Sequence, residues 1–169
     1  MSADLDGEFG GDPPCWAHLL DEPDRDLRDR GDIDVLVRDF YRQVAMDDVL
    51  GPVFRAARVD WSVHIPKLVD FWAWQLLGQR GYDGIPLRAH ERADARTPFA
   101  DEHYERWLEL FDTTVDERFR GPTAELAKRR ARRMARALRW LLSGESAAGS
   151  LPVNAMWLAT TPVTDRRAR

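Results

Sequence analysis

The chain has 169 residues, of which 44% are hydrophobic and 32% charged, so it is long enough for one folded domain with extensions at its ends. Its formal net charge of -4 argues against general nucleic-acid affinity, and no apolar run approaches the roughly 20 residues that span a bilayer. The single cysteine, Cys15, excludes an internal disulfide and suits a reducing compartment. The acidic, glycine-rich start is unlike a secretory signal. These features predict a cytoplasmic protein with neither nucleic-acid nor membrane partners.

Residues 1–30 are expected to form an N-terminal extension. The first 14 residues are rich in Gly, Asp and Pro, a composition typical of disorder. A short apolar cluster, which Pro23 terminates, predicts one brief helix packed on the domain: Trp16, Leu19 and Leu20.

Two long amphipathic helices are predicted next. The first covers 32–46, with Asp32 as its N-cap because a carboxylate there accepts amide hydrogens of the first turn. Gly51-Pro52 is then expected to break the chain. The second helix covers 60–77, and Pro66 is expected to kink its first turns or delay its start. Apolar residues recur at helical spacing in both: Ile33, Leu36, Val37, Phe40, Tyr41 and Val44, then Trp61, His64, Ile65, Leu68, Phe71, Trp72 and Leu76.

The stretch 78–98 is rich in glycine and proline and is predicted to be a loop with one helical turn over 86–91. A third helix is predicted over 101–119. A fourth begins at Pro122, which suits a first helical position, and stops at Ser143-Gly144. No period-two strand pattern occurs in the sequence, so the predicted fold class is all-α.

Three polar-tipped side chains fall on the apolar faces of three different helices: Tyr41, His64 and Trp107. Taken singly, each is most simply a core residue bonded to a backbone carbonyl. Taken together, they predict a small polar pocket in an aromatic cavity, where a ligand supplies the missing partners. His90 lies in the irregular segment, and neutral imidazole is a good ligand for iron. A lone loop histidine is more often at the surface, which is the interpretation of His18 and His103.

The fourth helix carries a run of basic residues. Its apolar residues keep their helical period through the run, so we interpret the run as a solvated face rather than a nucleic-acid site. The basic residues are Lys128, Arg129, Arg130, Arg132, Arg133, Arg136 and Arg139.

Seven short segments follow one another in a characteristic order: Phe40-Tyr41, Gly51-Pro52-Val53-Phe54, Trp61-Ser62-Val63-His64, Phe71-Trp72, Tyr82-Asp83-Gly84, Pro86-Leu87-Arg88-Ala89-His90 and Trp107-Leu108-Glu109-Leu110-Phe111. This ordered set resembles the truncated haemoglobin family, most closely its group III branch. The paired glycines typical of other truncated groups are missing. The resemblance covers about 31–142, which implies a truncated globin domain preceded by the extension 1–30 and followed by a C-terminal tail, 143–169.

The resemblance implies a truncated globin fold, a helical sandwich around a haem. It implies that His90 is the proximal iron ligand and that Tyr41 and Trp107 are distal hydrogen-bond donors. His64 corresponds to the distal-helix histidine, which acts as a donor, a gate or a second iron ligand. Pro66 departs from the group III pattern and can shift His64.

Further residues are implied to hold the cofactor itself. Phe54 stacks on the porphyrin, and Leu68 lines the ligand side, with Phe71 and Trp72 in the same apolar set. Lys67 is the cation expected near a haem propionate, and Arg88 and Arg92 are weaker candidates for the same role.

The implied function is a globin with haem b, held non-covalently because the chain has no Cys-x-x-Cys-His. It would bind O2 and other diatomic ligands for capture, sensing or redox detoxification, since several donors around one ligand favour these roles over simple oxygen transport. The alternative is a haem-dependent peroxidase or nitric oxide dioxygenase, which would need a separate reductase. A helical interaction module without a cofactor is the third hypothesis.

Overall fold

The computed structural model describes residues 25–143, which form helices and no strand. The predicted all-α class is therefore confirmed for this part of the chain. The helices are α1 (Arg30–Met46), α2 (Leu50–Ala56), α3 (Trp61–Leu77), α4 (Pro86–Asp94), α5 (Asp101–Arg118) and α6 (Pro122–Leu142).

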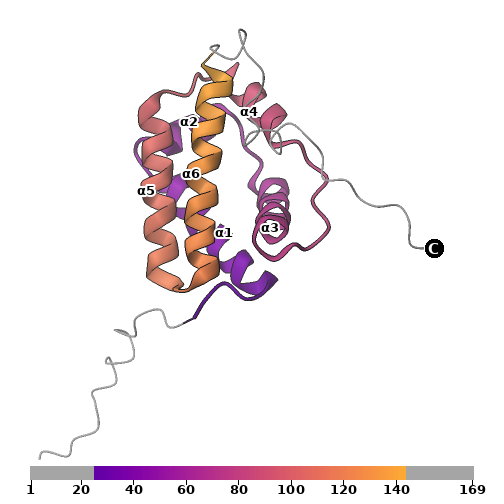
Figure 1. The fold of residues 1–169 in the computed structure, drawn as a ribbon. Helices are drawn as coiled ribbons and strands as arrows, with labels where there is room; N and C mark the ends of the chain where they lie inside the picture. The colour runs from indigo at the N-terminus through magenta and orange to yellow at the C-terminus, as the bar shows by residue number, and fades with distance from the viewer. Residues whose placement is uncertain (1–24, 144–169) are drawn as a thin grey trace, which may run out of the picture.

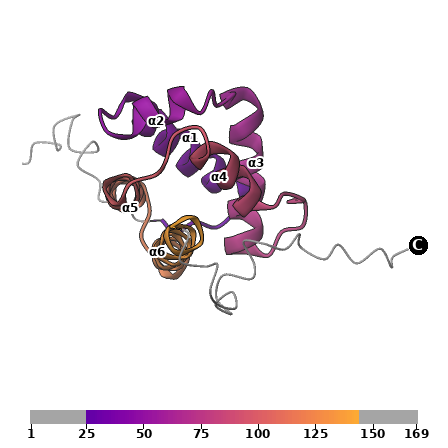
Figure 2. The same ribbon diagram turned by 90° about the horizontal axis from the view of Figure 1, so that it is seen from above.

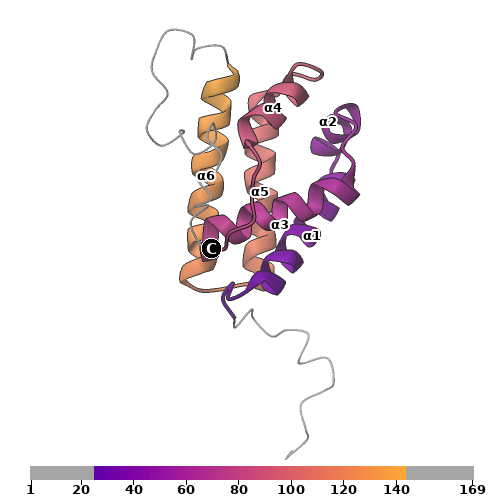
Figure 3. The same ribbon diagram turned by 90° about the vertical axis from the view of Figure 1, so that its right-hand side faces the viewer.

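The helices form two crossed layers. α5 and α6 lie side by side and antiparallel, while α1 and α3 form a second pair that crosses them (Figures 1 and 3). α1 packs on α5, and α3 reaches α6. The short helix α4 packs on α6 and lies over the space between the layers in the view from above (Figure 2).

Stacked aromatic rings fill the centre where the layers cross. Phe111 stacks on Trp72 with ring centroids 4.9 Å apart, and on Trp107 at 5.3 Å. Phe40 meets both Trp107 and Phe111 edge-on at 5.2 Å. Trp72, Phe40 and Phe111 are each only 1% exposed. Such pairs add to the gain from burial alone, so α1, α3 and α5 are held at this junction.

α1 starts one turn earlier than expected. Its N-cap is Asp29, whose side chain accepts a hydrogen bond from the Asp32 amide at 3.0 Å, so the prediction of Asp32 as N-cap is wrong. Asp32 lies within the helix, where it accepts from the Arg28 amide at 3.0 Å and pairs with Arg25 at 3.1 Å. Two acidic residues three positions apart are equivalent as caps in the sequence, and only the path of the preceding chain distinguishes them.

Gly51 and Pro52 do not break the chain as expected, because both lie in the first turn of α2. Proline is tolerated there since the first amides of a helix have no acceptor within it. The break comes earlier, where the Asp47 side chain accepts from the amides of Val49 and Leu50 at 3.0 and 2.9 Å. Gly51 permits a close approach, because a Cβ there would lie 3.0 Å from the Ala45 carbonyl oxygen.

Two other expectations about helix bounds need correction. α3 starts without delay, since Asp60 caps it by accepting from the Ser62 amide at 3.0 Å, and it continues through Pro66. α4 covers nine residues rather than one turn. Pro86 occupies its first position, and every glycine of the surrounding stretch precedes it, so nothing within 86–94 opposes a helix.

The described chain begins against the start of α6. The Asp26 carboxylate accepts hydrogen bonds from the amides of Thr123 and Ala124 at 2.9 and 2.8 Å, capping a helix whose own N-cap residue, Gly121, has no side chain. Gly121 has a φ of 145°, and a Cβ there would lie 2.5 Å from Asp26 Cγ. Glycine is therefore required at this contact, which we call the Asp26 clasp.

Some expectations fall outside the described residues. These are the disorder of residues 1–14, the short helix around Trp16 and the tail beyond residue 143. The domain boundaries remain a prediction. Within residues 25–143, no helix is sufficiently long and apolar to cross a lipid bilayer.

Candidate functional site

A cavity of about 430 Å³ opens between the two helix layers, with α4 along one side. Its wall is mainly aromatic and aliphatic, as in most ligand pockets. All residues singled out from the sequence for this site lie along it: Tyr41, Phe54, His64, Lys67, Leu68, Phe71, Trp72, Arg88, His90, Arg92 and Trp107. Residues from five helices therefore meet at one place.

His90 stands on α4, one turn after its first residue. Its Nδ1 atom lies 2.8 Å from the Pro86 carbonyl oxygen, which can only accept a hydrogen bond. This contact favours the tautomer with hydrogen on Nδ1 and leaves the Nε2 lone pair for the cavity. Burial lowers the pKa of His90, although the bond to Pro86 opposes the shift, so the ring is neutral at pH 7. A neutral, oriented imidazole suits metal ligation.

Tyr41 and Trp107 form a polar pair within the aromatic wall. The Tyr41 side chain is buried, with 7% of the residue exposed, and it bonds to the indole of Trp107, which can only donate. Burial raises the pKa of Tyr41 well above its usual value, and the bond from Trp107 only partly offsets this. The hydroxyl therefore keeps its hydrogen across the physiological pH range and can donate to a ligand.

His64 lies beside Tyr41. Its ring centroid is 5.9 Å from that of Tyr41 and 6.0 Å from that of Trp61, so Pro66 does not remove it from the cavity. Burial lowers the pKa of His64 to about 4, and electrostatic interactions with His90 and with the Lys67 ammonium contribute in the same direction. The imidazole is therefore neutral near pH 7 and able to accept as well as donate a hydrogen bond.

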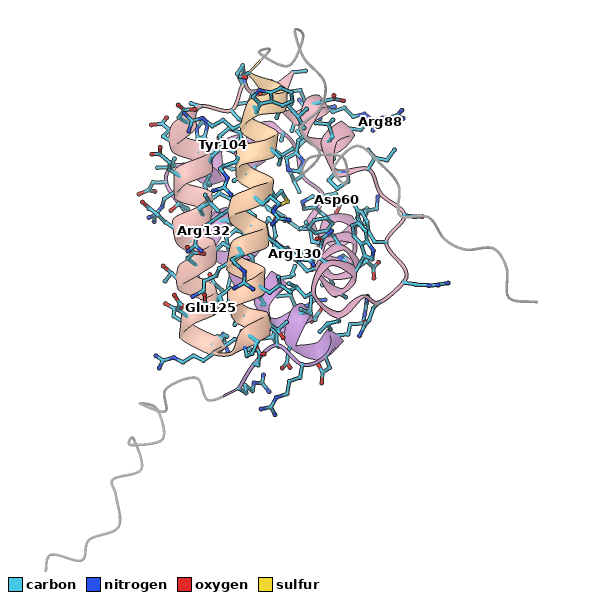
Figure 4. All side chains as sticks on the ribbon, in the orientation of Figure 1. Asp60, Arg88, Tyr104, Glu125, Arg130 and Arg132 are labelled. Carbon is cyan, nitrogen blue, oxygen red and sulfur yellow. The ribbon has the colours of Figure 1, made fainter. Side chains whose placement is uncertain are left out.

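Cationic side chains gather on the rim of the cavity. Lys67 on α3 and Arg88 and Arg92 on α4 are exposed and line the cavity. Figure 4 shows Arg88 projecting outward from α4. Such a rim can pair with carboxylates of a ligand whose apolar part lies inside.

The sequence analysis did not identify Tyr104 as a site residue. Tyr104 is on α5, where Figure 4 labels it. It lies one helical turn before Trp107 and lines the cavity. Its hydroxyl oxygen is buried without a hydrogen-bond partner among the described residues. Burial, and then the charges of Asp94 and Asp101, raise its pKa to about 12. The three-residue spacing from Trp107 was the available signal, but it indicates only a shared helix face.

His103 also differs from its expected place at the surface. Its side chain is 17% exposed and lines the cavity. Its Nδ1 atom accepts a hydrogen bond from the Ala100 amide at 2.9 Å, so it caps the start of α5. His18, which was also expected at the surface, lies outside the described residues.

No protein-family model matches the chain. The chain is similar to the Group 3 truncated hemoglobin ctb of Campylobacter jejuni subsp. jejuni serotype O:2, with 38% identity over 85 residues, which is 48% of this chain. The match spans 65% of that relative, just under two thirds of its length.

The fold is similar to the crystal structure of a group III truncated haemoglobin from Campylobacter jejuni. The TM-score is 0.62 at 30% sequence identity, and the match covers 73% of this chain and 97% of the other. Nearly the whole of that globin thus has its counterpart here, at an identity that supports common descent as well as a common fold. The chain belongs to the truncated haemoglobin family, in group III.

Proposed function

We propose that this protein is a globin that holds haem b in the cavity and binds O2 and other diatomic ligands for capture, sensing or redox detoxification. The observation that carries the proposal is the neutral His90, whose Nδ1 is bound to Pro86 and whose Nε2 is left for the cavity. Haem supplies the iron at which a diatomic ligand is held. Non-covalent haem b is proposed because the chain has no Cys-x-x-Cys-His, and the single cysteine suits the cytoplasm.

The residues present fit such a cofactor. The aromatic wall suits a flat apolar ring, while the rim formed by Lys67, Arg88 and Arg92 suits its carboxylates. Within residues 25–143, no three histidine, cysteine, aspartate or glutamate side chains gather as a metal site. One imidazole alone suits a metal that brings its other ligands with it, as haem iron does. The unpartnered Tyr104 hydroxyl leaves a donor in the wall for a bound group.

Tyr41 and Trp107 would hold the diatomic ligand. Both can donate a hydrogen bond at pH 7, and both lie along the mainly aromatic and aliphatic wall of the cavity. Hydrogen bonds to a ligand that carries partial negative charge contribute about 1.5–3 kcal/mol each. Such bonds act mainly by slowing ligand escape, which supports capture, sensing or redox chemistry over transport.

The second candidate is a haem-dependent peroxidase or nitric oxide dioxygenase. The observation that favours it is the neutral His64 beside the protonated Tyr41, because this pair can take up a proton and return one within the same cavity. Turnover also needs electrons, which a separate reductase would supply. Peroxide and nitric oxide consumption by the purified protein should then greatly exceed that of free haemin at equal concentration. Equal rates would leave only the binding function.

One spectroscopic series tests the main proposal. The purified protein should show a Soret band in the ferric state and a shifted band after reduction with CO. His90→Ala should lose or grossly alter this spectrum, whereas the control His18→Ala should keep it. Unchanged haem binding in His90→Ala would contradict the proposal, as would wild-type protein that takes up no haem on titration.

A further inference from the structure

The basic residues of α6 fall into two groups that differ in their partners. Those that face α5 are neutralised: Lys128 pairs with Asp116 at 2.6 Å and with Glu125 at 2.7 Å, Arg132 pairs with Asp112, and Arg139 pairs with Asp101. Figure 4 shows Arg132 on the side toward α5. This group explains part of the run as an ordinary helix–helix contact.

The second group has no such partners. Arg129, Arg133 and Arg136 are exposed, and none of them has a carboxylate partner within the described part of the chain. Their spacing of four and then three residues places them in one row, which we call the arginine stripe. Because no carboxylate neutralises it, the stripe is a positive surface along α6. Like charges at this spacing also repel one another, which an anionic partner would relieve.

Arg130 strengthens the positive field beside the stripe. Its guanidinium donates to Gln75 Oε1 of α3 at 2.7 Å, a neutral acceptor, and it lies between α6 and α3 in Figure 4. Burial, and then the charge of Arg133, lower its pKa. Each added cation favours a negatively charged occupant for this surface.

The Asp26 clasp brings the N-terminal segment of the chain to the end of α6 where the stripe begins. It fixes residue 26 to the first turn of α6, and the Arg120 amide donates to the Arg25 carbonyl at 3.0 Å. Residues 1–24 therefore join the domain at the start of α6, as the dark end of the ribbon shows in Figure 1. The stripe ends 12 residues after Ala124, about 18 Å along the helix, and an extended chain of five or six residues covers that length.

The charge of this segment is complementary to the stripe. Residues 1–24 contain seven aspartates and glutamates and no lysine or arginine. On α6, the three arginines of the stripe lack carboxylate partners, and Arg130 beside them bonds only to the neutral Gln75. We propose that residues 1–24 dock along the arginine stripe of α6 as an intramolecular acidic strap. The tether raises the effective concentration of the strap at this surface above that of an unlinked acidic peptide.

Zero-length cross-linking of the full-length, haem-loaded protein tests this docking. Arg133→Lys keeps the charge and adds an amine that carbodiimide can join to a nearby carboxylate. Mass spectrometry should find an amide between position 133 and an acidic residue of 1–24, at several times the yield for the matched control Arg80→Lys. A fivefold rise in ionic strength should remove the difference, because screening shortens the range of these interactions. Equal yields in the two variants would overturn the proposal.

The origin of the cross-link decides between the strap and a second copy. In a mixture of ¹⁵N-labelled and unlabelled chains, the linked peptides should carry one isotope only. Mixed pairs would overturn the intramolecular assignment and indicate contact between two copies.

A second measurement does not depend on cross-linking chemistry. Cys15 is the single cysteine of the chain, so a nitroxide can be attached there without other changes. Its electron paramagnetic resonance spectrum should show at least a twofold shorter correlation time in Arg129→Glu/Arg133→Glu than in the parent. The control Arg55→Glu/Arg80→Glu makes the same charge change at exposed positions outside α6 and should leave the spectrum unchanged. Equal mobility in all three proteins would overturn the proposal.

Discussion

The Nδ1 atom of His90 lies 2.8 Å from the Pro86 carbonyl oxygen, one helical turn earlier in α4. The contact holds the imidazole plane and assigns the ring hydrogen to Nδ1, so Nε2 keeps its lone pair. The contact is possible because α4 begins at Pro86, so the two residues lie one turn apart in the same helix. The orientation of the proposed iron ligand is thus a property of local backbone geometry.

Removal of the imidazole should be reversible by an added one. We expect His90→Gly to lose the wild-type Soret spectrum and to regain a histidine-like spectrum when free imidazole is added. The helix no longer holds the ring, so the regained ligation should require a large excess of imidazole. A titration followed by absorbance checks this. A wild-type spectrum before any imidazole is added would mean that another group binds the iron.

Trp107→Phe should affect ligand escape more than folding. The substitution removes the indole N–H that bonds to Tyr41 but keeps an aromatic ring that can stack on Phe111. With about 1.5–3 kcal/mol lost, O2 dissociation should become about 10- to 100-fold faster. Stopped-flow dissociation rates and thermal melting of the same sample check both parts. Unchanged dissociation rates would remove Trp107 from the proposed donors.

Tyr104→Phe should stabilise the haem-free protein. A buried hydroxyl without a partner lowers stability, so its removal should raise the free energy of unfolding by about 1 kcal/mol. Tyr41→Phe is the matched control, because it deletes a hydroxyl that does have a partner, and it should not give this gain. Urea unfolding of both apoproteins measures the difference. A loss of stability in Tyr104→Phe would mean that the hydroxyl is satisfied in solution.

Acid should weaken the corner between α1 and α2. Burial raises the pKa of Asp47, but the amides of Leu50 and Val49 and the guanidinium of Arg106 at 2.8 Å lower it further, so the net shift is downward. A carboxyl group with a lowered folded-state pKa stabilises the fold above its unfolded pKa, near 3.8. That contribution is lost as the pH falls through the lower, folded value.

Asp47→Asn isolates this effect. At pH 7 the variant should be about 1–2 kcal/mol less stable than the parent, because the amide can still accept from the backbone but carries no charge for Arg106. The difference should shrink as the pH falls below the unfolded pKa. Urea unfolding across this range checks the sign, and a difference that grows in acid would contradict it.

The sequence predicted the helices that have clear chemical signals at their ends. α5 was expected over 101–119 and covers Asp101–Arg118, and α6 begins at Pro122 as expected. It could not distinguish Asp29 from Asp32 as the cap of α1. The prediction that Pro52 breaks the chain was also wrong. A proline is tolerated in the first turn of a helix and disruptive further in, and the local sequence does not define where α2 starts.

The sequence predicted which residues would lie together, and their roles at the site remain a prediction. All the residues proposed for it line one cavity, since three helical faces and one irregular segment had to converge there. The helical turn expected over 86–91 contained both Pro86 and His90, but their contact could not be foreseen because the sequence does not determine how the imidazole is oriented. The Tyr104 hydroxyl lacks a partner because no described residue around it places a hydrogen-bonding group within reach. That depends on the packing of several helices, so no local sequence pattern indicates it.

The Asp26 clasp has a consequence for folding order. Its two hydrogen bonds join residues 97 and 98 positions apart, so they tie the start of the described chain to α6. Synthesis on the ribosome delivers α6 after the other described helices, and until then the Asp26 carboxylate lacks the amides of Thr123 and Ala124. Asp26 can therefore be held in place only after α6 has formed. Gly121→Ala, which disrupts this late contact, should slow the last step of folding and hasten unfolding.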